Sequence, residues 1–285
     1  MSTRYRVRHV THYRYDHAVA SARHFAHLTP RETAWQHVES HTLQVTPSPT
    51  EADPPAEDYH GNAVRRWAIG VPHRELTVEA TSVVALRTQL PAWEAADDWR
   101  DVLAAVGTAT APDIVEFTLP SPHVPLLAAA VEYARPSFVA ARPLHLALLD
   151  LAQRMRSDFA FDAGATTVAT PIAEVLLRRR GVCQDFAHCL LSALRGLGFA
   201  ARYMSGYVFD ERSEIRGGGA SHAWLGVWHP GGGWIGCDPT NGKLADLEFV
   251  TLGWGRDFGD VTPLRGVVLG QGGQRLSVSV EFDRL

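Results

Sequence analysis

The hydrophobic period of this chain changes from that of a strand to that of a helix and back again, and these changes limit the folds that the chain can adopt. From Tyr5 to Tyr15, every second residue is aromatic, β-branched or histidine, and arginine occupies three of the five positions between them as well as position 4. Such a period of two is typical of a β-strand with one buried face. No helical period appears before about residue 95. Further strands are indicated at residues 42–45, 64–71 and 76–86.

A helical period begins at Leu144 and continues through Leu148, Leu151 and Met155, which predicts one buried stripe. A second helix is expected after Thr170-Pro171, because a capping residue followed by proline is a common helix start. A third is expected to start near residue 183 and to stop at Gly198. Strand-like runs follow at 201–209, 222–228, 234–237 and 276–282.

These periods predict an α+β chain in three parts. Residues 1–88 should form an N-terminal antiparallel β-sandwich-like domain. Residues 89–143 contain many prolines and should form a connector with short helices at about 99–106 and 125–133. Residues 144–285 should form a core unit in which helices pack on an antiparallel sheet and which includes the C-terminal strand.

Composition narrows the classes of function. The net charge of −4 argues against a broad surface for nucleic acid. No apolar leader segment is visible in the first fifteen residues, and no run reaches the ~18 apolar residues of a membrane span. Three cysteines are too few, and odd in number, for a disulfide framework. We therefore expect free thiols, a cytoplasmic location and no membrane partner.

Cys183 stands where a nucleophilic thiol would be placed. It follows Gly181-Val182 at the first turn of an amphipathic helix. A helix N-terminus carries unpaired N–H groups and partial positive charge, which favour a thiolate. Cys189 lies inside the same helix and lacks this setting, and Cys237 lies near a strand end.

A thiolate nucleophile needs a base, and the base needs a group that orients it. His222 begins one predicted strand and Asp238 ends the next. Two adjacent antiparallel strands would bring their side chains close enough for the carboxylate to hold the imidazole. The order Cys, His, Asp therefore predicts a thiol catalytic triad.

Four motifs occur in a fixed order: RGVCQDFAH at 180–188, ARYMSGY at 201–207, SHAW at 221–224 and GWIGCDPTN at 233–241. Together they resemble the bacterial transglutaminase-like family. Segments 5–15, 28–31 and 61–62 resemble the N-terminal region that precedes this core in the family. The resemblance covers nearly all of the chain except residues 90–140.

The resemblance implies a papain-like core and acyl transfer through a thioester on Cys183, with His222 as general base and then acid and Asp238 as its orienting partner. It implies a peptide or protein substrate with an amide or isopeptide bond. Water or an amine can resolve the thioester, as in peptidases and transglutaminases respectively. For the oxyanion, the donors we consider are the backbone N–H of Cys183 and Gln184. The residues considered for substrate binding are Phe161, Tyr207 and Trp224.

Two other interpretations remain open at this point. A metal site has suitable ligand types in His188 and the three cysteines, but no metal-binding spacing supports it, so we expect neither metal nor cofactor. A catalytically silent peptide-binding or scaffold protein on the same fold is the second. An intact triad argues against it.

Overall fold

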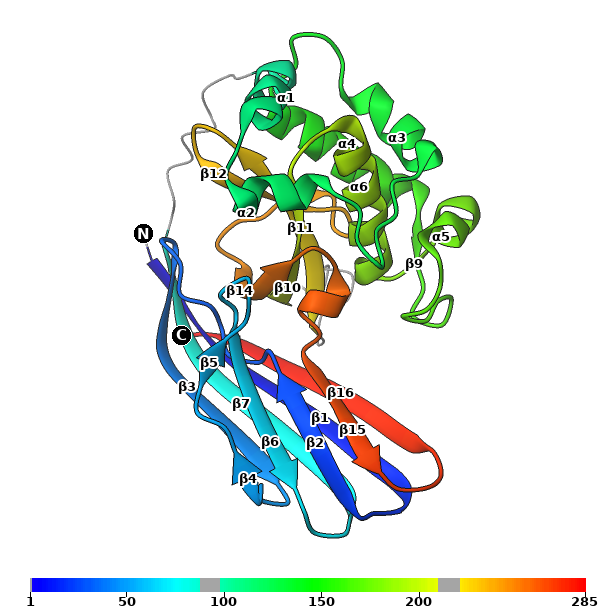
Figure 1. The fold of residues 1–285 in the computed structure, drawn as a ribbon. Coiled ribbons are helices and arrows are strands. Elements are labelled where there is room, and N and C mark those ends of the chain that lie inside the picture. The colour runs from blue at the N-terminus through cyan, green and yellow to red at the C-terminus, as the bar shows by residue number, and fades with distance from the viewer. Residues whose placement is uncertain (1, 88–97, 210–220) are drawn as a thin grey trace.

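The computed structural model describes residues 2–87, 98–209 and 221–285. It consists of a β-sandwich, in the lower half of Figure 1, and a mixed unit of helices packed on an antiparallel sheet, in the upper half. The expected α+β class is confirmed. No helix in the described ranges is both long and apolar enough to cross a membrane.

The sandwich is made of two antiparallel sheets. The first has the order β16-β1-β7-β3, and the second has the order β15-β2-β6-β4, with β5 also paired to β6. Between them lies an apolar core that includes Trp67, Ile69, Leu76 and Val78. The strands are β1 (Ser2–Val19), β2 (Ser21–Ala26), β3 (Gln36–Thr46), β4 (Glu51–Ala52), β5 (Ala56–Glu57), β6 (Ala63–Ile69), β7 (His73–Arg87), β15 (Leu264–Leu269) and β16 (Gln274–Arg284).

The C-terminal strand was expected within the catalytic core of 144–285, and this placement was wrong. β16 pairs with β1 from Tyr5↔Arg284 to Tyr15↔Gln274, and β15 pairs with β2. Figure 1 shows both strands, in red and orange, beside the blue strands of the sandwich. A period of two marks a strand but does not select its neighbour, because any strand edge offers the same backbone groups. The boundary expected at 88–89 lies outside the described residues.

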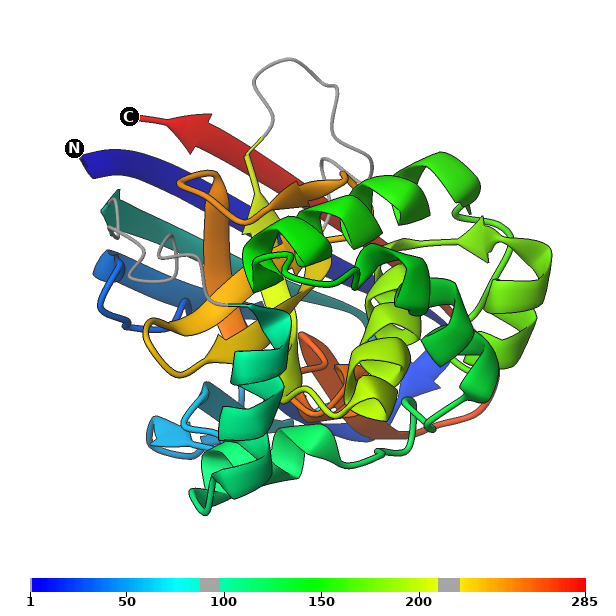
Figure 2. The same ribbon diagram turned by 90° about the horizontal axis from the view of Figure 1, so that it is seen from above.

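The mixed unit has a five-stranded sheet in the order β13-β12-β11-β10-β14. Helices α3, α4 and α6 lie on one side of it (Figure 2). The long helix α6 is buried at every residue from Asp185 to Arg195. It ends at Gly198, whose φ of 101° is a left-handed conformation that glycine adopts without strain.

The elements of the mixed unit have these bounds: α1 (Trp99–Thr108), α2 (Pro112–Val115), η2 (Glu116–Thr118), α3 (Ala128–Ala134), η3 (Arg135–Ser137), α4 (Leu144–Asp158), β8 (Ala160–Phe161), α5 (Ile172–Arg178), β9 (Arg180–Gly181), α6 (Cys183–Leu197), β10 (Ala201–Val208), β11 (His222–His229), β12 (Gly233–Asp238), β13 (Lys243–Leu244), β14 (Phe249–Gly255) and η4 (Phe258–Asp260). The short helices predicted near residues 99 and 125 correspond to α1 and α3. Strands β2, β14 and β15 were not predicted.

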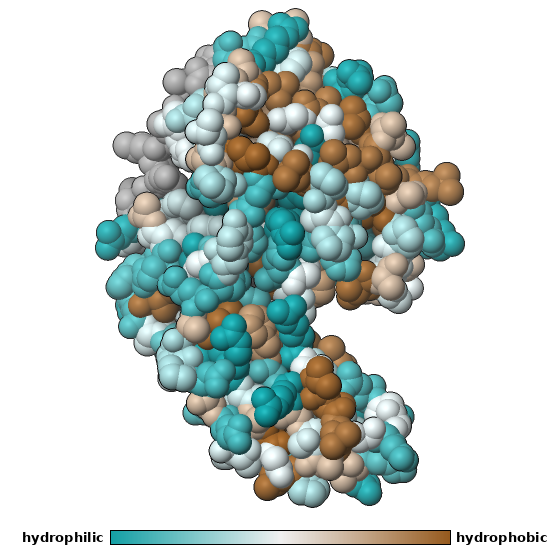
Figure 3. All heavy atoms as spheres, in the orientation of Figure 1, coloured by the Kyte–Doolittle hydropathy of each residue, from teal (hydrophilic) through white to brown (hydrophobic). Residues whose placement is uncertain are grey.

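Strand β1 is long enough for its buried face to pack against both halves of the molecule. Near its end, Tyr15 packs inside the sandwich. Near its start, Tyr5 and Val7 pack against Tyr207 of β10 and Val250 of β14. On the face shown in Figure 3, hydrophilic residues gather where the two halves meet.

Candidate active site

Cys183 is the first residue of α6, as the sequence predicts, and its side chain is half-buried. The turn before it is held by Asp185, whose carboxylate accepts hydrogen bonds from the backbone N–H of Val182 at 2.9 Å and from the hydroxyl of Thr166 at 2.6 Å. A Cβ at Gly181 would lie 2.6 Å from the Asp185 carboxylate, so no larger residue fits there. The approach of the chain to Cys183 therefore depends on a glycine and a buried carboxylate.

His222 and Asp238 lie on the neighbouring strands β11 and β12. Nε2 of His222 is 2.9 Å from Oδ2 of Asp238, and both side chains are fully buried. The same carboxylate accepts hydrogen bonds from the backbone N–H of Thr240 and from the side-chain amide of Asn241. Burial would raise the pKa of Asp238, but the imidazole and these donors outweigh it and lower that pKa below its ordinary value.

The imidazole of His222 shows the converse shift. Burial disfavours its charged form, but the negative charge of Asp238, its hydrogen bond and the nearby Cys183 thiol together raise its pKa well above the ordinary value. The thiol and the ring are therefore neighbours. Because Nε2 is taken by Asp238, Nδ1 is the nitrogen left for the thiol, and it is buried without a hydrogen-bond partner among the described residues. The structure thus brings the three predicted residues together.

Of the predicted substrate-binding residues, two are fully buried, although the ring of Trp224 lies 6.1 Å from that of His222. Trp224 is 1% exposed and packs against Phe249, and Tyr207 is 2% exposed, with its hydroxyl 2.9 Å from Nδ1 of His9. Neither can contact a substrate, so those two assignments were wrong. Alternation along a strand shows that a residue faces one side, but not which side is covered. Phe161 is half-buried on β8, which pairs with β9 just before Cys183.

Two residues beside the triad were not identified from the sequence. Tyr203 on β10 belongs to the buried core against which Cys183 packs, and burial followed by the charge of Cys183 raises its pKa well above the ordinary value. Asn241 supports the carboxylate of Asp238. Both lie within the quoted motifs, but nothing in their spacing distinguishes them from packing residues. Gln184, considered as an oxyanion donor, is half-buried in the first turn of α6.

The other cysteines and His188 occupy structural positions. Burial raises the pKa of the Cys189 and Cys237 thiols. Nε2 of His188 accepts a hydrogen bond from the backbone N–H of Phe258 at 3.2 Å. Across residues 2–87, 98–209 and 221–285, no three histidine, cysteine, aspartate or glutamate side chains are grouped so as to hold a metal ion.

Known proteins resemble this chain along most of its length. The family model of the bacterial transglutaminase-like N-terminal region matches residues 5–85, and that of the transglutaminase-like superfamily matches residues 135–239. An uncharacterized protein of Mycobacterium tuberculosis is 40% identical over 283 residues, covering 93% of this chain and 87% of the relative. One from Mycobacterium leprae is 32% identical over 285 residues, covering 99% of each.

A solved structure shares the fold. The crystal structure of a Cytophaga hutchinsonii protein, titled as a candidate cysteine protease, superposes with a TM-score of 0.79 at 21% identity, covering 100% of this chain and 91% of the other. Both halves of the present chain, and their order, therefore occur together in other proteins. With the two family matches and the mycobacterial relatives, this shows that the chain belongs to the bacterial transglutaminase-like family.

Proposed function

We propose that this protein is a thiol-dependent acyl-transfer enzyme that acts on an amide or isopeptide bond of a peptide or protein. The observation that carries the proposal is the bonding of the His222 ring. One of its nitrogens is held by a fully buried carboxylate, and the other is buried, free of a described hydrogen-bond partner and next to the half-exposed Cys183. This is the arrangement in which an imidazole takes a proton from a thiol.

The proposed reaction proceeds in two halves. The Cys183 sulfur attacks the carbonyl carbon of the amide, and a tetrahedral oxyanion forms near the start of α6, where the backbone N–H of Cys183 can donate to it. The C–N bond then breaks, and the proton on His222 passes to the leaving amine. A thioester on Cys183 remains. Asp238 keeps the ring oriented and stabilises its charged form throughout.

The second half returns the enzyme to its starting state. Water or a primary amine loses a proton to His222 and attacks the thioester carbon, and the C–S bond breaks with release of an acid or a new amide. The thiolate of Cys183 and the protonated His222 are restored together. Both acceptors are consistent with the residues described, so the choice between peptidase and transglutaminase rests on experiment.

The first experiment measures the alkylation rate of Cys183 by iodoacetamide from pH 4 to 10, with the site identified by mass spectrometry. The parent and His222→Ala are compared, with His229→Ala as the matched control because His229 is a buried histidine at the other end of β11. We expect Cys183 to react at low pH in the parent and in His229→Ala, and to lose this reactivity in His222→Ala. An unchanged profile in His222→Ala would show that the thiol–imidazole pair is not assembled, which favours the silent scaffold.

The second experiment identifies the acceptor. The protein is incubated with a glutamine-containing peptide and a labelled primary amine, and with the peptide alone, and amide formation and acid release are compared. Amine incorporation that Cys183→Ala abolishes indicates a transglutaminase, and acid release with the same dependence indicates a hydrolase. The proposal also places the reaction in the cytoplasm, which cell fractionation can test.

A further inference from the structure

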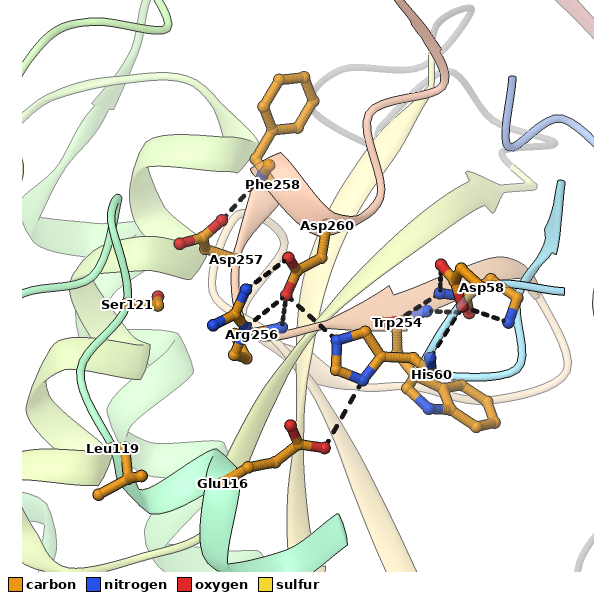
Figure 4. Close-up of polar contacts among 12 residues, drawn as sticks. Asp58, His60, Glu116, Leu119, Ser121, Trp254, Arg256, Asp257, Phe258 and Asp260 are labelled. Atoms are coloured by element: carbon orange, nitrogen blue, oxygen red, sulfur yellow. Dashed lines mark hydrogen bonds and ion pairs between the residues drawn. The ribbon is translucent and has the colours of Figure 1, made fainter. Parts of the chain in front are cut away.

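A cavity of about 630 Å³ lies where the sandwich meets the mixed unit. Its walls come from both halves: residues 31–35 and 59–60 of the sandwich, and residues 112–113 and 116–117 with Arg202, Trp234 and Trp254 of the mixed unit. Figure 4 shows three of these segments converging, with His60 next to Trp254 and reaching Glu116. The cavity is therefore bordered by parts of the chain that are distant in sequence.

The cavity is separate from the triad. Ala201 and Tyr203 belong to the core under α6, so Arg202 between them points to the opposite face of the sheet. On β10, Arg202 pairs with Gly226, whereas Gly206 pairs with His222. Four residues along a strand correspond to ~13 Å. A ligand in this cavity would not contact Cys183.

Two arginines and two tryptophans form an alternating stack at the cavity wall. Cζ of Arg202 lies 4.1 Å from the ring centre of Trp234 and 3.7 Å from that of Trp254. Cζ of Arg31 lies 3.5 Å from the ring centre of Trp254. Two guanidinium groups cannot occupy one face of an indole at these distances, so Trp254 lies between the two cations. The stack fixes both groups in position.

Neither arginine of the stack has a carboxylate partner in the described part of the chain. Arg202 is 3% exposed, and its Nε is buried without a hydrogen-bond acceptor. Arg31 donates from Nη1 to the uncharged side-chain oxygen of Asn62 at 2.8 Å. The cavity also contains Asp113 and Glu116, but no ion pair connects either of them to the two arginines. Buried charges are normally paired, because an unpaired one costs several kcal/mol.

We propose that this cavity binds a ligand that carries a carboxylate or phosphate group, whose oxygens accept hydrogen bonds from Arg31, while the charge of Arg202 on the other face of Trp254 adds attraction. The planar guanidinium presents parallel N–H donors that match both groups. The volume is in the range of cavities that hold small metabolites, and the indole rings offer an apolar surface to the rest of the ligand. Because Arg31 belongs to the sandwich and Trp254 to the mixed unit, a ligand that contacts both would hold the two halves together.

The test is isothermal titration calorimetry of the parent protein with sodium phosphate and, separately, with sodium succinate, at an ionic strength kept constant with chloride. We expect saturable binding of one equivalent of at least one probe, and the one that binds assigns the ligand to phosphates or to carboxylates. In Arg31→Gln, Kd should rise about tenfold or more. The matched control is Arg14→Gln, because Arg14 lines a different arginine-rich cavity of the sandwich.

A second measurement distinguishes a loss of binding from a loss of folding in the variant. Circular dichroism checks that Arg31→Gln is folded, and thermal unfolding is recorded with each probe against chloride. The bound probe should raise the Tm of the parent and of Arg14→Gln, but not that of Arg31→Gln. If neither probe binds saturably, or if the folded Arg31→Gln binds as the parent does, the proposal is overturned and the stack serves only to join the halves.

Discussion

Replacing Asp238 by asparagine should abolish the function of His222 as a base while largely keeping the shape of the site. The carboxylate of Asp238 accepts four hydrogen bonds. Its Oδ1 accepts from the backbone N–H groups of Thr240 and Asn241. Its Oδ2 accepts from His222 and from the side-chain amide of Asn241. An asparagine whose oxygen serves the two backbone groups must turn its NH₂ toward the other two donors.

The magnitude follows from that mismatch. Two hydrogen bonds to a charged oxygen are lost, each contributing about 1.5–3 kcal/mol, and a flip of the His222 ring proton to Nδ1 can recover one of them. We therefore expect the free energy of unfolding to fall by about 2–4 kcal/mol. In the flipped tautomer Nδ1 carries the proton and cannot accept one from the thiol, so activity should fall about 10³–10⁴-fold, as in triads with the wrong tautomer.

The same substitution should change the response to pH. The Asp238 charge is what keeps the pKa of the buried His222 high, and without it burial alone acts and lowers that pKa. The imidazolium is then absent at neutral pH. Iodoacetamide should alkylate Cys183 in the variant only above about pH 8, as it does a free cysteine, whereas the parent reacts at lower pH.

Urea unfolding and site-resolved alkylation measure the two effects on the same preparation. Asp260→Asn is the matched control, since Asp260 also bonds a shielded histidine, His60, at 3.2 Å, but lies at the junction of the halves (Figure 4). It should lower stability and leave the alkylation profile of Cys183 unchanged. If Asp238→Asn also leaves that profile unchanged, Asp238 only holds the turn at 238–242, and the reasoning is refuted.

Three further predictions concern the support of the site and the stability of the fold. Gly181→Ala should displace the start of α6, because its Cβ would clash with Asp185. We expect the free energy of unfolding to fall by about 1–3 kcal/mol and the alkylation of Cys183 at low pH to be lost. Normal alkylation of Cys183 in this variant would contradict the prediction. Asn62→Ala should lower the free energy of unfolding in urea by about 2–4 kcal/mol, because it leaves the buried backbone groups of Trp254 unsatisfied, without altering alkylation. Four shielded histidines should make the fold labile to acid. Burial lowers the pKa of these histidines below the value of 6.5 in an unfolded chain, so the unfolded state binds more protons as the pH falls. Their contribution to the free energy of unfolding is therefore fully present above pH 6.5 and is lost progressively below it. Each should cost about 1–2 kcal/mol at pH 5, and an equal urea midpoint at pH 7 and pH 5 would exclude this. The four are His9, His24 and His41, with pKa values of about 4, and His188, with a pKa of about 3.

Local pattern was sufficient for much of the fold and for the central part of the site. The alternation from Tyr5 to Tyr15 predicted the face of β1 that is buried, and the spacing of apolar residues predicted α6 and its start at Cys183. These features depend on neighbours within one turn or one strand, which the sequence states directly. The order of Cys183, His222 and Asp238 predicted that the three side chains lie together. The short turn between β11 and β12 makes these strands antiparallel neighbours and so brings His222 close to Asp238.

Only the tertiary structure decided which surfaces those elements meet. The sequence by itself determined that residues 276–282 form a strand and that Trp224 alternates with its neighbours, but not that the strand joins the sandwich or that Trp224 is covered. Arg31 and Arg202 each resemble an ordinary surface residue in the sequence, and only the fold places them on either side of one indole. The physical reason is that a local period determines which side of an element is apolar, whereas its partner depends on packing between segments distant in the chain.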